Sequence, residues 1–96
     1  TGIGSVGGDI MMEREVICGL PAGIHARTAV ELYCLAKKYS GIMTLEHEGV
    51  CSNLLSMLDI MRLNVACGDK VRLAIQSPEE TMAMEAIVNY IQGGQL

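Results

Sequence analysis

The alternation of apolar and polar residues along the chain predicts short strands. The clearest case is 70–75, where Val71, Leu73 and Ile75 fall on one side of an extended backbone. The dipeptide Glu48-Gly49 indicates a tight hairpin between two further strands, because glycine readily adopts the turn conformation. Strands are predicted over 13–18, 42–47, 50–52 and 70–75.

Apolar residues at helical spacing predict two helices between these strands. The first runs from Ala26 to Tyr39 and stops at Ser40-Gly41. The second begins at Ser52-Asn53 and continues to about Leu63. Its apolar residues cover nearly the whole circumference of the helix. A short helix of that kind is either buried or presents an apolar docking surface.

A third helix is predicted after Ser77. Serine as N-cap, Pro78 in the first helical position and Glu80 in the third match a capping box. The helix ends at Gly93-Gly94. Its predicted apolar stripe consists of Met82, Ala83, Ala86, Ile87, Tyr90 and Ile91.

The order βαββαβα predicts one α+β domain, with helices over one face of an antiparallel sheet. The chain of 96 residues is long enough for one modest core. The first ten residues include four glycines and little to bury. We therefore expect 1–11 to be a disordered leader or linker and 12–96 to be the domain.

Charge and hydropathy exclude some classes of function. The net charge is −4 and no Lys/Arg cluster occurs, which argues against nucleic acid as a partner. The apolar runs are too short for membrane insertion. The spacing of the four cysteines, at 18, 34, 51 and 67, matches no metal site, so neither a metal nor a redox cofactor is expected. Two disulfides are possible, but buried free thiols in a reducing cytoplasm are the favoured interpretation.

The candidate chemistry lies in Gly23-Ile24-His25-Ala26-Arg27-Thr28-Ala29. Here His25 stands at or beside the start of the first helix, where unpaired N–H groups and the helix dipole favour an anion. An imidazole with Arg27 two residues on could accept and hold a phosphoryl group. The competing interpretation is an ordinary loop histidine beside a solvated arginine.

Two motifs give the chain its resemblance to a known family. The segment 23–29 is similar to G-[IL]-H-[AT]-R-P-A, and 53–58 followed by Met61, Leu63 and Gly68 is similar to N-x-K-S-[IL]-M with a spaced M-x-L-G. Both belong to the histidine-containing phosphocarrier (HPr) family of the bacterial phosphoenolpyruvate-dependent sugar phosphotransferase system. The resemblance covers Met12 to Gly93.

The resemblance implies an open-faced β-sandwich of four antiparallel strands with three helices on one face. It implies a cytoplasmic carrier, rather than a stand-alone catalyst, that needs no cofactor. Enzyme I would phosphorylate His25 on Nδ1, and the group would pass to the IIA domain of a sugar permease. Arg27 would pair with the phosphate, which the helix start at Ala26 and Thr28 would cradle. Ser56 matches the serine modified by a regulatory HPr kinase/phosphorylase. The second helix would dock partners through Leu54, Leu55, Met57, Leu58 and Met61.

Several positions depart from the family pattern. Thr28 stands where the family has proline, Leu55 replaces a lysine, and Asp59 and Arg62 bring charge into the docking helix. These departures leave the His25–Arg27 pair intact. They also leave open an alternative function as a regulatory or scaffold paralogue that acts by docking alone.

Overall fold

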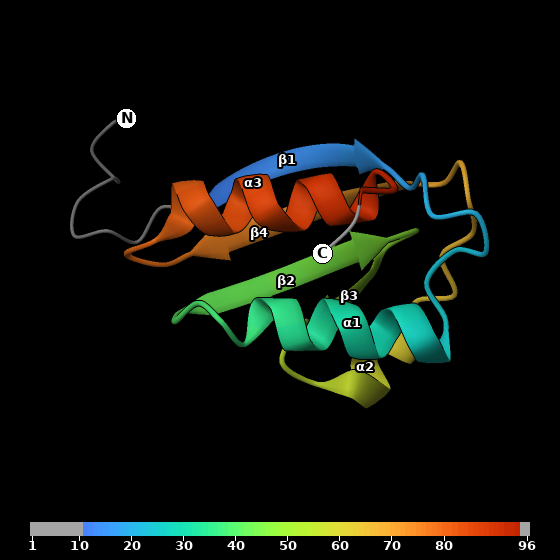
Figure 1. Cartoon of the computed structure of the whole chain (residues 1–96), viewed down its shortest axis with the longest axis horizontal. Helices are drawn as coiled ribbons and strands as arrows, with labels where there is room; N and C mark the ends of the chain where they lie inside the picture. The colour runs from blue at the N-terminus through green and yellow to red at the C-terminus, as the bar shows by residue number, and fades with distance from the viewer. Residues whose placement is uncertain (1–10, 95–96) are drawn as a thin grey trace.

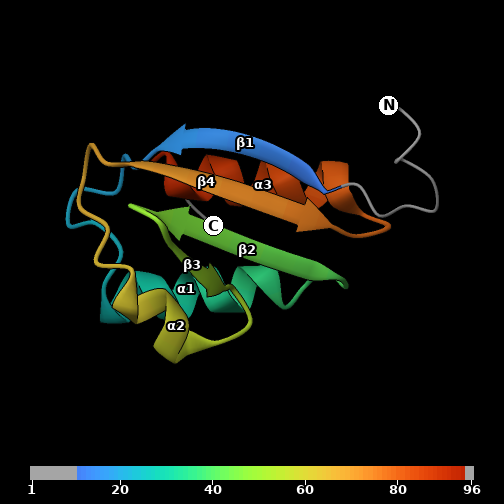
Figure 2. The same cartoon turned by 180° about the vertical axis from the view of Figure 1, so that it is seen from behind.

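The computed structural model describes residues 11–94. Four strands form one antiparallel sheet in the order β1-β4-β2-β3. Helices α1 and α3 lie over one face of this sheet (Figure 1), and the view from behind shows the other face uncovered (Figure 2). The shorter α2 packs against α1 and β3. The elements, in chain order, are β1 Met12–Ile17, α1 Ala26–Ala36, β2 Ile42–His47, β3 Val50–Asn53, α2 Met57–Arg62, β4 Lys70–Gln76 and α3 Glu80–Ile91.

The predicted fold class and element order βαββαβα are therefore confirmed. The core fills the space between the sheet and the helices, and the predicted inward residues of β4, Val71, Leu73 and Ile75, are all buried in it. No helix within residues 11–94 has the length and apolar content to cross a bilayer. Most of the leader predicted over 1–11 lies outside the described residues.

The second helix begins later than predicted. Asn53 is still paired with Thr44 in the sheet, and its side-chain oxygen accepts a hydrogen bond of 2.9 Å from the Leu55 N–H. This turn separates strand from helix, because an Asn side chain can satisfy the backbone locally. Ser56, and not Ser52 or Asn53, is the N-cap, and its hydroxyl accepts from the N–H of Asp59 at 3.4 Å.

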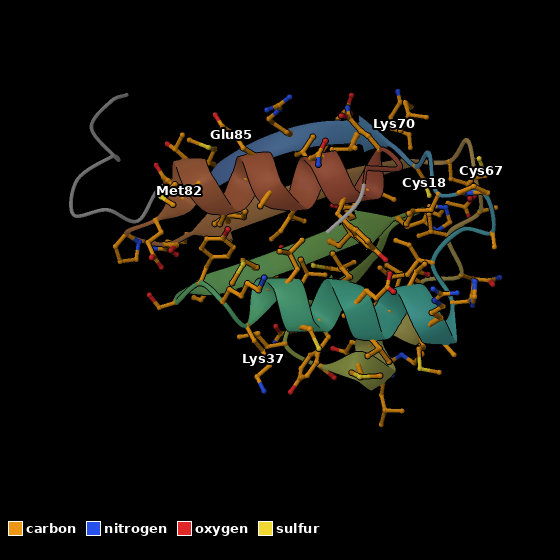
Figure 3. The ribbon with its side chains drawn as sticks, in the orientation of Figure 1. Cys18, Lys37, Cys67, Lys70, Met82 and Glu85 are labelled. Atoms are coloured by element: carbon orange, nitrogen blue, oxygen red, sulfur yellow. The ribbon has the colours of Figure 1, made fainter. Side chains whose placement is uncertain are left out.

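The third helix is also displaced from its prediction. Ser77 accepts a 3.0 Å hydrogen bond from the N–H of Glu79, but it does so within a turn, and the helix N-cap is Glu79. The capping box at Ser77 and Glu80 was therefore a wrong prediction. The predicted apolar stripe is confirmed for Ala83, Ile87, Tyr90 and Ile91, which are buried, and Ala86 is partly buried against the core, but Met82 was a wrong prediction. Met82 is 63% exposed on the outer side of α3, near Glu85 (Figure 3), and the buried residues are Ala83, Met84, Ile87, Val88, Tyr90 and Ile91.

The first helix ends at Ala36, three residues before its predicted end. Its last turn tightens, because the N–H groups of Lys38 and Tyr39 bond to carbonyls three residues earlier. The chain then reverses at Ser40-Gly41, as predicted, and enters β2.

The cysteines are free, but most are not buried. Cys18 is 1% exposed in the core, whereas Cys34, Cys51 and Cys67 are exposed. Burial was therefore a wrong prediction for three of the four. Apolar neighbours in the sequence suggested burial, but Cys34 of α1 and Cys51 of β3 lie on the outward sides of their elements, and Cys67 lies in an exposed turn.

Candidate functional site

His25 is the N-cap of α1 and is solvent-exposed. The helix has no acidic residue in its first turn, so the positive end of its dipole is not offset there. The Gly23 backbone has φ +75°, and a Cβ at this position would collide with the Val65 carbonyl oxygen. Only glycine combines this conformation with so close an approach.

The loop that leads to His25 is held by backbone hydrogen bonds at both ends. The Cys18 N–H donates to the Asp69 carbonyl at 2.8 Å, and the Gly68 N–H donates to the Cys18 carbonyl at 2.8 Å. The Ile24 N–H donates to the Val65 carbonyl at 2.9 Å. Figure 3 shows Cys18 and Cys67 at this end of the molecule. His25 is therefore presented by a braced loop.

Thr28 fixes the helix start. Its hydroxyl accepts a hydrogen bond of 2.9 Å from the His25 N–H and donates one of 2.8 Å to the Gly23 carbonyl. The first of these is half of a capping box, with threonine in the role usually taken by Glu or Gln. The predicted cradle residues Ala26 and Thr28 thus lie in the first turn of α1, directly after His25.

Arg27 lies beside His25 on the surface. Its side chain is 83% exposed, and its Nε is 3.6 Å from the Glu31 carboxylate one turn further along α1. The other oxygen of Glu31 accepts a hydrogen bond of 2.5 Å from the Tyr90 hydroxyl of α3. Burial and this hydrogen bond raise the pKa of Tyr90.

These side chains line one open depression of about 570 Å³. Glu31 and Tyr90 were missed at the sequence level. The spacing of four residues between Arg27 and Glu31 was an available signal. No local sequence pattern could have linked Tyr90 to Glu31, because the two residues are 59 positions apart. The lining residues are Leu20, Pro21, Ala22, His25, Arg27, Thr28, Glu31, Tyr90 and Gly94.

The second histidine has a different environment. His47 is 6% exposed, and its Nδ1 and Nε2 lie 2.8 Å from the Leu63 carbonyl and 3.0 Å from the Asp69 carboxylate. Glu46 and Glu48 flank His47 in the sequence, and their negative charges would repel a phosphate there. The structure adds that both ring nitrogens are engaged and that the ring is buried, so His47 is a structural residue.

The predicted docking residues divide into two groups. Leu55, Leu58 and Met61 are 39%, 75% and 43% exposed, and Met57 is half-buried. Leu54 is wholly buried, and its N–H donates to the Met43 carbonyl at 3.0 Å. Its assignment as a docking residue was wrong, because it precedes α2 and extends inward from the end of β3. Ser56 is half-buried at the N-cap of α2.

No cluster of three or more His, Cys, Asp or Glu side chains that could hold a metal ion occurs in residues 11–94. The chemistry that the depression offers is that of an exposed nucleophilic imidazole. A guanidinium and a helix N-terminus, both suited to an anion, lie beside it.

Comparison with known proteins relates this chain to a family. A family model described as "PTS HPr component phosphorylation site" matches residues 12–93. The phosphocarrier protein HPr of Treponema pallidum is 28% identical over 71 residues, covering 74% of this chain and 81% of that protein. The HPr-like protein Crh of Bacillus subtilis is 30% identical over 82 residues, covering 85% of this chain and 96% of that protein.

Two solved structures have the same fold as this chain. The phosphocarrier protein HPr from Bacillus anthracis superposes with a TM-score of 0.83 at 24% identity, covering 86% of this chain and 99% of that one. HPr-C-His from Thermoanaerobacter tengcongensis superposes with a TM-score of 0.80 at 30% identity, covering 90% and 100% of the two chains.

Proposed function

Because the chain belongs to the HPr family of the phosphotransferase system, we propose that it carries a phosphoryl group on His25. Phosphorylated enzyme I is the donor, and the IIA component of a sugar permease is the acceptor. The observation that carries the proposal is the exposed His25 at the N-cap of α1, with Arg27 two residues on.

The proposed step is a simple exchange of bonds. An unprotonated ring nitrogen of His25, Nδ1 in this proposal, attacks phosphorus, and the bond between phosphorus and its donor atom breaks with its electron pair on the donor. The other ring nitrogen keeps its proton. Arg27 and the N–H groups at Ala26 and Thr28 then face the phosphoryl oxygens. Reversal of the same step on an acceptor regenerates the free imidazole.

Partner contact is assigned to the outer surface of α2 and of the turn that precedes it. Leu55, Leu58 and Met61 supply exposed apolar area, and α2 packs directly on α1, which carries His25. A small apolar surface suits transient exchange between partners. Asp59 and Arg62, 3.7 Å apart, add a charged pair that is expected to narrow the choice of partner. This proposal places the protein in the cytoplasm with the soluble components of the system.

Mass spectrometry tests the central step. Purified enzyme I and phosphoenolpyruvate should add one acid-labile, base-stable phosphoryl group to this protein. Trypsin cleavage at neutral pH separates the histidines, because His25 falls in peptide 15–27 and His47 in peptide 39–62. We expect the label on 15–27 and its loss in His25→Ala. Label retained in His25→Ala, or no label with the protein's own enzyme I, would refute the carrier function.

A second candidate function is supported by relatives named HPr-like protein Crh. In this alternative the protein acts only by docking, and Ser56 is the regulated position. Ser56 caps α2, and its hydroxyl accepts a hydrogen bond from the Asp59 N–H, so a phosphate on Ser56 would lie close to the Asp59 carboxylate. Under the carrier proposal we expect an HPr kinase with ATP to modify Ser56 weakly or not at all beside a standard HPr, because Leu55 and Asp59 depart from the family pattern. Full modification of Ser56 without phosphorylation of His25 would favour the docking function.

A further inference from the structure

Three side chains from two helices form a series of contacts beside His25. The Nε atom of Arg27 lies 3.6 Å from Glu31 Oε2, and the Tyr90 hydroxyl donates to Glu31 Oε1 at 2.5 Å. The two contacts use different oxygens of one carboxylate, so they form simultaneously. Glu31 therefore joins a buried residue of α3 to the arginine assigned to the phosphoryl group.

This series of contacts is buried at one end and exposed at the other. Tyr90 is 3% exposed, the Glu31 side chain is 33% exposed and the Arg27 side chain is 83% exposed. The core thus sets the position of the carboxylate. Burial first, and the bond to Glu31 second, raise the pKa of Tyr90, so its hydroxyl keeps its proton and remains a donor at neutral pH.

The same depression is lined by His25, Arg27, Glu31 and Tyr90. A phosphoryl group on His25 would therefore meet a fixed carboxylate as well as a guanidinium. Like charges repel, and one guanidinium cannot neutralise two anionic groups equally. The Arg27 contact is made through Nε, while a guanidinium carries four further N–H donors on its two Nη atoms. Because its side chain is 83% exposed, Arg27 can turn from one anion to the other and offer these donors to the phosphoryl oxygens.

We propose that Glu31, held by Tyr90, is a positioning residue that competes with the phosphoryl group on His25 for Arg27. The inference rests on the proposed carrier function and adds a control to it. In the free protein Arg27 is paired with Glu31. On phosphorylation the guanidinium moves to the phosphoryl oxygens, while Tyr90 keeps the carboxylate in the depression, where it still attracts Arg27. Competition leaves the phosphohistidine less stabilised and readier to give up its group.

The alternative is that Glu31 and Tyr90 only tie α1 to α3. The two roles differ in what they change. A structural tie alters the free energy of unfolding and leaves the chemistry of phosphohistidine unchanged. A competing counter-ion alters the lifetime of the N–P bond even where folding is unaffected.

The decisive variant is Glu31→Gln, in which an amide oxygen still accepts from Tyr90 but the charge is gone. His25 is phosphorylated chemically with phosphoramidate, the adduct is mapped to peptide 15–27, and its hydrolysis is followed by ³¹P NMR. We expect a lifetime roughly two- to five-fold longer than in the wild type, the range of an exposed ion pair. The matched control is Glu15→Gln, which removes another paired carboxylate, 3.7 Å from Arg72 and outside the depression. Its lifetime should equal that of the wild type.

Tyr90→Phe tests the link to α3. Because the tyrosine acts through Glu31, its substitution should lengthen the lifetime less than Glu31→Gln does, and the double variant should match Glu31→Gln alone. A lifetime in Glu31→Gln no longer than in Glu15→Gln, or additive effects of the two substitutions, would overturn the inference. Phosphoramidate bypasses enzyme I, so failure of enzyme I transfer counts against the carrier function alone.

Discussion

The Thr28 hydroxyl and the His25 backbone N–H are joined by a hydrogen bond of 2.9 Å across the first turn of α1. The same hydroxyl donates to the Gly23 carbonyl at 2.8 Å, so one side chain in the first turn of the helix holds both the N-cap and the loop before it. The family signature has proline at this position, which presets the backbone by its ring. Here hydrogen bonds supply the order that the ring would give.

Removal of these hydrogen bonds should destabilise the protein. Thr28→Val keeps the shape of the side chain and deletes the hydroxyl, at an expected cost of about 0.5–2 kcal/mol in the free energy of unfolding. Phosphorylation of His25 should slow in parallel, because the helix start is less ordered. Urea titration gives the stability. Thr81→Val, at an exposed position of α3, is the control, and equal losses in both variants would contradict the role of Thr28.

Arg27→Ala should separate transfer from stability. With 83% of its side chain exposed, the arginine contributes little to folding, and we expect a change within about 0.5 kcal/mol. Loss of a charged partner for the phosphoryl group should slow acceptance from enzyme I by about 10- to 100-fold. Quenched-flow measurement of phosphohistidine formation tests this. Arg72→Ala, also exposed and paired with a carboxylate, that of Glu15, controls for surface charge, and transfer at the wild-type rate in Arg27→Ala would refute the assignment.

The thiols should react in two classes. Cys34, Cys51 and Cys67 are exposed and should react with a chromogenic disulfide reagent in the native protein. Cys18 should react only on unfolding, because it is 1% exposed and burial raises the pKa of its thiol. Peptide mapping after pulsed alkylation identifies each site. Rapid native labelling of Cys18 would contradict its place in the core.

Alkaline pH should destabilise the protein through Tyr90. Its folded-state pKa is raised by burial and by Glu31, so the group stabilises the fold fully below its unfolded value near 10. That contribution is lost as pH rises above 10, because the tyrosine of the unfolded chain releases its proton first. The free energy of unfolding then falls by up to about 1.4 kcal/mol per pH unit. Denaturant titrations at pH 8 and 11 should show a steeper loss in the wild type than in Tyr90→Phe, and parallel losses would argue against the shift.

Local sequence determined much of this molecule. Alternation placed β4 and its inward residues Val71, Leu73 and Ile75 correctly, since extended backbone sends successive side chains to opposite faces. Helical spacing and the glycine at 23 placed His25 at the start of α1. These properties depend on neighbours within one or two turns of chain.

Only the tertiary structure decided which sides of the elements became buried. It placed Leu54 in the core, left Cys34 and Cys51 exposed, and enclosed His47 between Leu63 and Asp69. It also brought the Tyr90 hydroxyl to Glu31 across 59 residues. The physical reason is that burial and long-range hydrogen bonds depend on how α1, α2 and α3 pack on the sheet, and no periodicity within a single element records the position of its neighbours.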